Sequence, residues 1–294
     1  MPRPPDISIT APDAQNDPPM LKLGVVPYLN VRPLVWAFAD AERPTDVTSA
    51  PPRLVLPHAE LFAAPPRALA GQLREGRFDA AIVPVFEFLS NPVYTLAAGA
   101  AIGCLGPVKS VVLFSETPLD AIRHVRLDTA SLTSVHLLAV LAAEMGLRMT
   151  MDDPVPDETK PARLGPGEAR LMIGDPALAR RGRHAFEFDL GELWADLTGG
   201  LPFVFASWCM PPATRHGPVA EILRRAKVAG VANLTAVARE AAVMFDTDAD
   251  NALDYFTNHI RYDFGEPELA GLREFARLCA KHGHIAKAPD IRLA

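Results

Sequence analysis

Amide and hydroxyl side chains follow the first predicted strand at the point where it leaves the sheet. Tyr28 and Asn30 come directly after the buried run LKLGVV, residues 21–26. The Asn30 amide can donate a hydrogen bond to a substrate oxygen, and Tyr28 offers an aromatic wall and a hydroxyl. Alternatively, an Asn at this place caps the helix that follows. The pattern makes Asn30 a candidate catalytic residue and Tyr28 a candidate binding residue.

A turn rich in hydroxyl groups enters a long apolar helix in the middle of the chain. It contains Ser131, Thr133 and Ser134 and follows Asp128. Hydroxyl groups at a helix start are ordinary caps. The free N–H groups and the positive end of the helix dipole also make such a start an anion site. The turn holds no Arg or Lys, so we expect it to favour a small, partly desolvated carboxylate of a substrate over a phosphate.

Two further turns carry candidate site residues. Gly174 lets a ligand approach the backbone closely. Its neighbour Asp175 is either the N-cap of a helix that begins at Pro176, or a group that orients a hydroxyl, contacts the other half of the molecule or serves as a catalytic base. Ser110, near the predicted connection between the two halves, can face a cleft as a hydroxyl donor, and Lys109 beside it meets either a carboxylate or solvent.

Motifs for cofactor and metal chemistry are missing from the 294 residues. The sequence contains no GxGxxG, GxxxxGK[ST], HExxH or GxSxG pattern. His282 and His284 stand close together, but in a polar tail where a solvated pair is the usual outcome. We therefore expect neither a cofactor nor a metal.

Composition and charge fit a soluble globular protein. Hydrophobic residues make up 49% of the chain, charged residues 22%, and the net charge is -6 without a basic run, so we expect no nucleic-acid and no membrane partner. The three cysteines are far apart and form no CxxC, which favours a reducing compartment. The segment 1–19, rich in Pro and Asp, lacks the pattern of a signal peptide. We expect a disordered extension, an alternative start at Met20, a cytoplasmic location and a monomer or homodimer.

Hydrophobic periodicity predicts alternating strands and helices, and this alternation predicts a parallel sheet covered on both faces. A buried strand that exits sharply into a short helix occurs twice, in LREGRFDAAIVPVFEF and PGEARLMIGDPALA, which indicates two related α/β lobes. We expect lobe I at 20–108 plus 202–294, lobe II at 109–201, a helical tail from about Pro218 to His282 packed on lobe I, and a ligand cleft between the lobes. Strands are expected at 21–26, around Leu54, and at 78–84, 108–115, 125–128, 169–175 and 201–210, and helices at 34–39, 68–76 and 131–146.

Six motifs in register resemble the chorismate dehydratase family of the futalosine route to menaquinone. They are VVPYLNVRPL, GPVKSVVLFS, LDTASLTSVHLLAVL, ARLMIGDPAL, FDLGELWADLTGGLPFVFASW and YDFGEPELAGLREF, and they span about Leu21 to Ile285. The resemblance implies a two-lobed periplasmic-binding-protein type 2 fold, loss of water from chorismate to give 3-[(1-carboxyvinyl)oxy]benzoate, and site residues at Asn30 and in the turn 131–134. The family turn usually reads SSRTS, whereas Ala130 and Leu132 stand here in place of a Ser and an Arg.

Two other functions stay open at the level of sequence. A 1,4-dihydroxy-6-naphthoate synthase-like enzyme of the same pathway shares the fold, but its first motif runs through SPCPND, whereas this chain reads PYLN at 27–30. A non-catalytic solute-binding protein of a transporter also has this fold, since fold does not determine function. The absence of a signal-peptide pattern disfavours it, and such a protein would bind an aromatic acid and release it unchanged.

Overall fold

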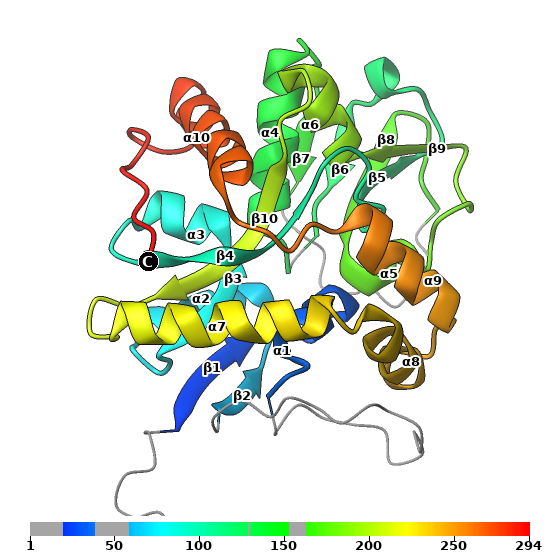
Figure 1. Ribbon diagram of the computed structural model, residues 1–294. Coiled ribbons are helices and arrows are strands. Elements are labelled where there is room, and N and C mark those ends of the chain that lie inside the picture. The colour runs from blue at the N-terminus through cyan, green and yellow to red at the C-terminus, as the bar shows by residue number, and fades with distance from the viewer. Residues whose placement is uncertain (1–19, 39–58, 129, 153–162) are drawn as a thin grey trace, which may run out of the picture.

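The computed structural model describes residues 20–38, 59–128, 130–152 and 163–294 (Figure 1). The expected extension at 1–19 and the expected strand around Leu54 lie outside these residues. The remaining elements form two five-stranded sheets. We call the first sheet and its helices lobe I and the second sheet and its helices lobe II, while the lobe boundaries given above stay a prediction.

Strands from both ends of the chain build the sheet of lobe I. Its order is β2-β1-β3-β10-β4. Strand β1 pairs in parallel with β2 and β3, whereas β10 runs antiparallel to β3 and β4. The strands are β1 (Leu21–Val25), β2 (Ala59–Ala63), β3 (Ala80–Pro84), β4 (Thr95–Cys104) and β10 (Phe203–Met210).

The middle of the chain builds the sheet of lobe II. Its order is β7-β6-β8-β5-β9. Strand β6 is parallel to β7 and β8, and β5 is antiparallel to β8 and β9. The strands are β5 (Val111–Ser115), β6 (His124–Arg126), β7 (Thr150–Asp152), β8 (Glu168–Ile173) and β9 (Phe186–Asp189).

The expectation of a parallel sheet is confirmed for only part of each sheet, because both sheets are mixed. The antiparallel strands β5 and β10 are the first strands after the two crossings between the lobes. Successive parallel strands of one sheet are joined by a crossover connection, usually a helix. A strand that enters its sheet directly from the other lobe has no such connection before it, so it can run antiparallel to its neighbours. Alternation along the sequence shows which segments are strands, but not from which side of the sheet they enter.

Helices complete each lobe and connect the strands. The expected helices at 68–76 and 131–146 are confirmed as α2 and α4, and the one at 34–39 begins earlier and is short. The helices are α1 (Arg32–Val35), α2 (Pro66–Arg74), α3 (Val85–Ser90), α4 (Thr133–Glu144), α5 (Gly174–Leu178), α6 (Leu190–Thr198), α7 (His216–Val231), α8 (Leu234–Met244), α9 (Ala249–Asp254) and α10 (Glu266–Lys281), with short turns η1 (Leu29–Val31), η2 (Leu119–Ala121) and η3 (Tyr255–His259).

The helical tail packs on lobe I as expected, and it also contacts lobe II. Helix α7 covers β4 and α1, while α10 packs on β10 and lies beside α4 of lobe II (Figure 1). Trp194 of α6 meets Phe203 and Phe275 edge to face, with ring centroids 5.1 and 6.1 Å apart. These aromatic contacts join lobe II to lobe I and to the tail.

A buried carboxylate stabilises the first crossing between the lobes. Asp189 is 2% exposed and caps α6 by accepting hydrogen bonds from the backbone N–H groups of Gly191 and Glu192. It also accepts the N–H of Val108 at 3.0 Å and that of Lys109 at 2.7 Å. Lys109 has φ +62°, in the left-handed region that a residue with a side chain rarely adopts. Asp189 therefore fixes an unfavourable backbone conformation at the crossing.

Three features of the described residues concern membrane spans, metal sites and disulfides. No helix in this part of the chain is long and apolar enough to span a bilayer. The same residues contain no group of three or more His, Cys, Asp or Glu placed to hold a metal ion. Cys104, Cys209 and Cys279 are free and buried.

Candidate active site

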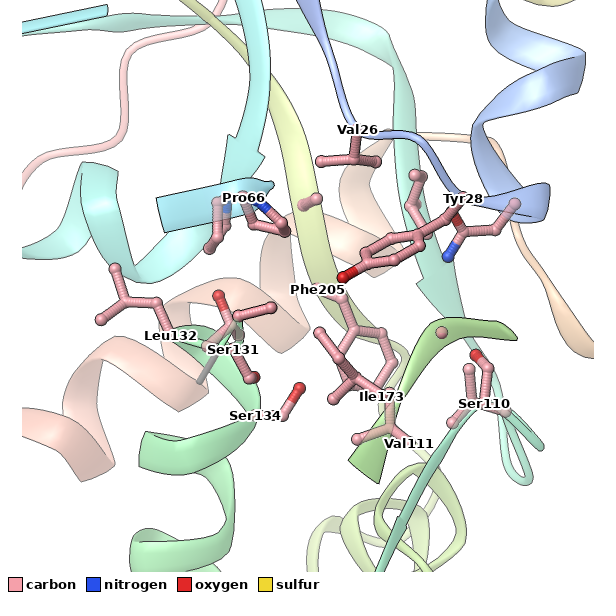
Figure 2. A pocket seen from close by; sticks show the side chains of 18 of the residues that line it. Val26, Tyr28, Pro66, Ser110, Val111, Ser131, Leu132, Ser134, Ile173 and Phe205 are labelled. Carbon is pink, nitrogen blue, oxygen red and sulfur yellow. The ribbon is translucent and has the colours of Figure 1, made fainter. Parts of the chain in front are cut away.

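A pocket lies between the lobes, and the space inside it, which includes open solvent, is about 580 Å³. Figure 2 shows Tyr28 pointing into it, with Ser131, Leu132 and Ser134 on the opposite side. Lobe I and the tail supply one wall, from the segment after β1, the start of α2, strands β3, β4 and β10, and Ile260. Lobe II supplies the other wall, from the starts of β5, α4 and α5 and the end of β8.

Seven of the eight candidate residues line this pocket, although they are widely separated in sequence. The exception is Asp175. The loops that carry the seven residues follow β1, precede β5, precede α4 and follow β8, so they meet where the two lobes face each other. The seven are Tyr28, Asn30, Ser110, Ser131, Thr133, Ser134 and Gly174.

Asn30 has an unused hydrogen-bonding oxygen at the pocket. It lies in η1, and neither η1 nor α1 has a side-chain cap, so the alternative that Asn30 caps a helix is wrong. Its Oδ1 is buried and has no hydrogen-bond partner among the described residues, and the side chain lies close enough to the Tyr255 hydroxyl to lower the pKa of that phenol. A buried amide oxygen without a partner is costly. A bound substrate that donates a hydroxyl proton to it removes that cost.

The hydroxyl-rich turn also does not cap its helix. The N-cap of α4 is Leu132, and it makes no side-chain cap hydrogen bond. The Asp128 carboxylate instead accepts from the N–H groups of Ala130 and Ile173, at 2.8 and 3.1 Å. Thr133 Oγ1 accepts the N–H of Phe86 at 3.2 Å, which links the two lobes. The first N–H groups of α4 have no partner inside the helix, and Leu132, Thr133 and Ser134 at this helix start line the pocket.

Asp175 lies behind the pocket. It is the second residue of α5, whose N-cap is Ile173, so the expectation that Asp175 is the cap is wrong. Both carboxylate oxygens accept the N–H of Leu29 at 3.1 Å. The carboxylate borders a second cavity, which Lys109 and Tyr255 also line. Burial raises the pKa of Asp175 to about 6. Asp175 thus connects lobe II to the loop that carries Tyr28 and Asn30.

The described lining of the pocket holds no charged side chain. It contains no Asp, Glu, Lys, Arg or His. Lys109, which the sequence placed next to the pocket, instead forms an ion pair with Asp254 at 2.8 Å. Any anionic group of a ligand would interact with hydroxyls, amides and helix N-termini in this part of the site.

Gly174 is expected to be necessary for the position of Tyr28. Gly174 has φ +64°, and a Cβ there would lie 3.2 Å from the Tyr28 ring. Gly174→Ala should therefore push the ring aside and lower kcat/KM about tenfold or more in a steady-state assay with the enzyme's substrate. Gly182→Ala is the matched control, because Gly182 has φ +75° and a Cβ added there would meet nothing within 4 Å. Equal losses of kcat/KM in the two variants would mean that backbone strain at the glycine, and not displacement of the Tyr28 ring, causes the loss.

Sequence reasoning missed several residues of the site. Phe205 and Ala206 come from β10, which was predicted as a strand but not assigned to the site, and Ile260 follows η3. Tyr255 was assigned only to the helical tail, yet its hydroxyl donates to Ser110 Oγ at 2.7 Å. These residues were hidden because they are apolar or lie on elements whose contact with the pocket depends on the tertiary fold.

Solved structures similar to this one confirm the fold class predicted above. Protein AF1704 from Archaeoglobus fulgidus matches with a TM-score of 0.63 and 17% identity, over 90% of this chain and 98% of its own. The periplasmic aliphatic sulphonate binding protein SsuA from Escherichia coli matches with a TM-score of 0.61 and 14% identity, over 93% and 96%. At these identities the likeness shows the two-lobed periplasmic-binding-protein fold alone.

Sequence comparisons identify the family. A protein described as chorismate dehydratase from Thermus thermophilus is 29% identical over 235 residues, which cover 72% of this chain and 84% of that protein. The family model described as menaquinone biosynthesis matches residues 21–281. That range includes every candidate residue of the pocket. The chain belongs to this menaquinone biosynthesis family.

Proposed function

We propose that this protein is a chorismate dehydratase, a hydro-lyase that converts chorismate to 3-[(1-carboxyvinyl)oxy]benzoate and water. Membership of the menaquinone biosynthesis family and the similar chorismate dehydratase support the reaction. The observation that carries the mechanism is the described pocket lining, which has hydroxyls and an amide but no carboxylate or imidazole. The site is therefore suited to orienting a substrate that supplies its own base.

The reaction needs one proton to leave carbon and one hydroxide to leave the ring. Removing the proton from the ether-bearing carbon leaves an electron pair that forms the new double bond as hydroxide departs, so proton and hydroxide leave as water and the ring becomes aromatic. The carboxylate of the enolpyruvyl group is the base in this proposal. General-base catalysis requires first that the base reach the proton in the bound geometry.

The pocket residues have separate roles in that geometry. Asn30 and the hydroxyls of Ser131 and Ser134 hold the substrate and stabilise the charge that develops as the bonds change. The start of α4 receives a carboxylate through the N–H groups of its first turn, which have no partner inside the helix. The contact of Thr133 with Phe86 joins the lobes beside the pocket, which keeps water away from the reacting groups.

Asp175 is the competing base, and Asp175→Asn separates the two mechanisms. Because Asp175 does not line the pocket and accepts the Leu29 N–H, the amide should retain its structural role. We expect kcat to stay within about threefold of wild type, whereas loss of a general base lowers turnover by about 100-fold or more. Steady-state rates with chorismate measure the difference, and a loss of the larger size would establish Asp175 as the base.

The same variant should report burial of the carboxylate. Its pKa of about 6, above the ordinary 3.8, means that the folded state binds the proton more tightly between these values. The charged carboxylate therefore opposes folding above pH 6, and this cost disappears as the pH falls toward 3.8. Urea unfolding should show the stability of Asp175→Asn, relative to wild type, falling between pH 7 and pH 4. A difference that is constant with pH would contradict this.

Two assays distinguish the proposed function from its alternatives. Purified protein is given chorismate and, separately, the cyclised dehypoxanthine futalosine derivative on which the dihydroxynaphthoate synthase acts, and products are followed by mass spectrometry. The dehydratase removes water from chorismate and leaves the second compound unchanged. Turnover of the second compound alone would assign the sister function. Tight binding of chorismate in calorimetry without turnover of either compound would indicate a binding protein, the function of several proteins with this fold.

A further inference from the structure

The hydroxyl of Tyr255 is buried next to the pocket and is not part of its lining. Tyr255 is 3% exposed and begins η3, a π-helical turn between α9 and α10. Its hydroxyl donates to Ser110 Oγ at 2.7 Å, across 145 positions of sequence. Single π-turns inside helices are often found at functional sites. Burial raises the pKa of this phenol above its ordinary value, so the hydroxyl keeps its proton.

Donation by Tyr255 determines where the Ser110 proton points. A serine hydroxyl has one proton and accepts through its lone pairs. Ser110 is 1% exposed and lines the pocket, and its hydroxyl makes no other hydrogen bond within the described residues. Since Tyr255 already supplies the proton between the two oxygens, the proton of Ser110 is available to a ligand in the pocket.

The backbone holds Ser110 at this place from both sides. The Gly174 N–H donates to the Ser110 carbonyl at 2.8 Å, and the Ser110 N–H donates to the Val108 carbonyl at 2.8 Å. Asn30 lies near the same Tyr255 hydroxyl and lowers its pKa. Tyr255 is thus next to two pocket residues, Ser110 and Asn30, and it donates its hydrogen bond to Ser110 Oγ.

We infer that Tyr255 is a positioning residue, which directs the Ser110 hydroxyl proton to an oxygen of the bound substrate that accepts a hydrogen bond. Suitable acceptors are a carboxylate oxygen or the ring oxygen that departs in the reaction. The inference rests on the proposed function for its substrate. It also predicts that Tyr255 and Ser110 act as one unit, because the Tyr255 hydroxyl donates to Ser110 Oγ and does not itself line the pocket.

A double-mutant cycle with chorismate tests this inference. Tyr255→Phe and Ser110→Ala should each lower kcat/KM about tenfold, the scale of one hydrogen bond to a charged group, and should divide the loss between kcat and KM in the same way. The double variant should be no slower than Ser110→Ala. Losses that multiply, or full activity in Tyr255→Phe, would overturn the inference.

Tyr262→Phe is the matched control for removal of a buried phenolic hydroxyl. Tyr262 lies near Tyr255, and its hydroxyl is buried without a hydrogen-bond partner among the described residues. This variant should leave kcat/KM unchanged, and urea unfolding of all variants should show folded proteins. Equal losses of kcat/KM in Tyr262→Phe and Tyr255→Phe would mean that the Tyr255 hydroxyl affects activity through packing and not through its hydrogen bond to Ser110.

Failure of the proposed function gives a result different from failure of the positioning role of Tyr255. If the folded wild type does not turn over chorismate, the reaction is wrong, and the same cycle is then measured as the Kd of chorismate by calorimetry. Tyr255→Phe and Ser110→Ala should weaken binding alike, with no further loss in the double variant. Unchanged Kd in Tyr255→Phe would overturn the positioning role independently of turnover.

Discussion

Asn30→Ala is expected to lower kcat for chorismate by about 100-fold or more, the effect of removing one preorganised polar group from a developing charge. Stability should change little, because Asn30 caps no helix and its buried Oδ1 has no partner among the described residues. Removing an unpaired buried acceptor can even stabilise a fold. Steady-state kinetics and urea unfolding of the same preparation measure both quantities.

A second asparagine controls for the loss of an amide. Asn91 follows α3, outside the described pocket lining, where its Nδ2 donates to the Tyr94 hydroxyl at 3.4 Å. Asn91→Ala should keep kcat near the wild-type value. An Asn30→Ala protein that is folded and fully active would remove Asn30 from the mechanism, whereas one that unfolds readily would give Asn30 a structural role.

Asp189→Ala is expected to cost about 3 kcal/mol of unfolding free energy, because buried N–H groups left without an acceptor each carry a desolvation penalty. The carboxylate accepts from Val108 and Lys109 at the crossing between lobes and from Gly191 at the start of α6. Losing these bonds also releases the left-handed conformation of Lys109. Urea-induced unfolding measures the loss.

An exposed helix cap provides the comparison for Asp189. Asp248 caps α9 by accepting the N–H groups of Asp250 and Asn251 at 2.9 and 3.0 Å, and it has no bond to a crossing segment. Asp248→Ala should cost about 1 kcal/mol, the ordinary value of an N-cap. Similar losses in the two variants would mean that the bonds from Asp189 to Val108 and Lys109 add no stability.

The sequence predicted those parts of the pocket in which polar side chains stand at the end of a predicted strand or at the start of a predicted helix. Tyr28 and Asn30 follow a buried strand, and Ser131, Thr133 and Ser134 precede an apolar helix, so their convergence follows from the edge at which ligands bind in α/β sheets. Their bonding partners could not be predicted in this way. The start of α4 looks like a capping sequence, yet Asp128 binds the nearby N–H groups and leaves Leu132 at the cap.

The features that the sequence did not predict have physical reasons in the composition and the contacts of particular elements. Strand β4, with the sequence TLAAGAAIGC, is rich in Ala and Gly, which are uncommon in strands, so its pattern did not predict a strand. Asp175 followed by Pro176 is typical of a helix start, but the carboxylate contacts Leu29, 146 positions away. Tyr255 likewise reaches Ser110 only through the tertiary fold. Contacts between distant segments leave no local signal in the sequence.

The most direct test of the proposed reaction is the mass of the product formed from chorismate. Purified protein is incubated with chorismate alone, without metal or nucleotide, beside a sample without protein and one with Asn30→Ala, and the products are separated and weighed by mass spectrometry. We predict a product lighter by one water, formed by the wild type well above both controls. Unchanged chorismate with a folded wild-type protein would contradict the assignment of this pocket as a dehydratase site.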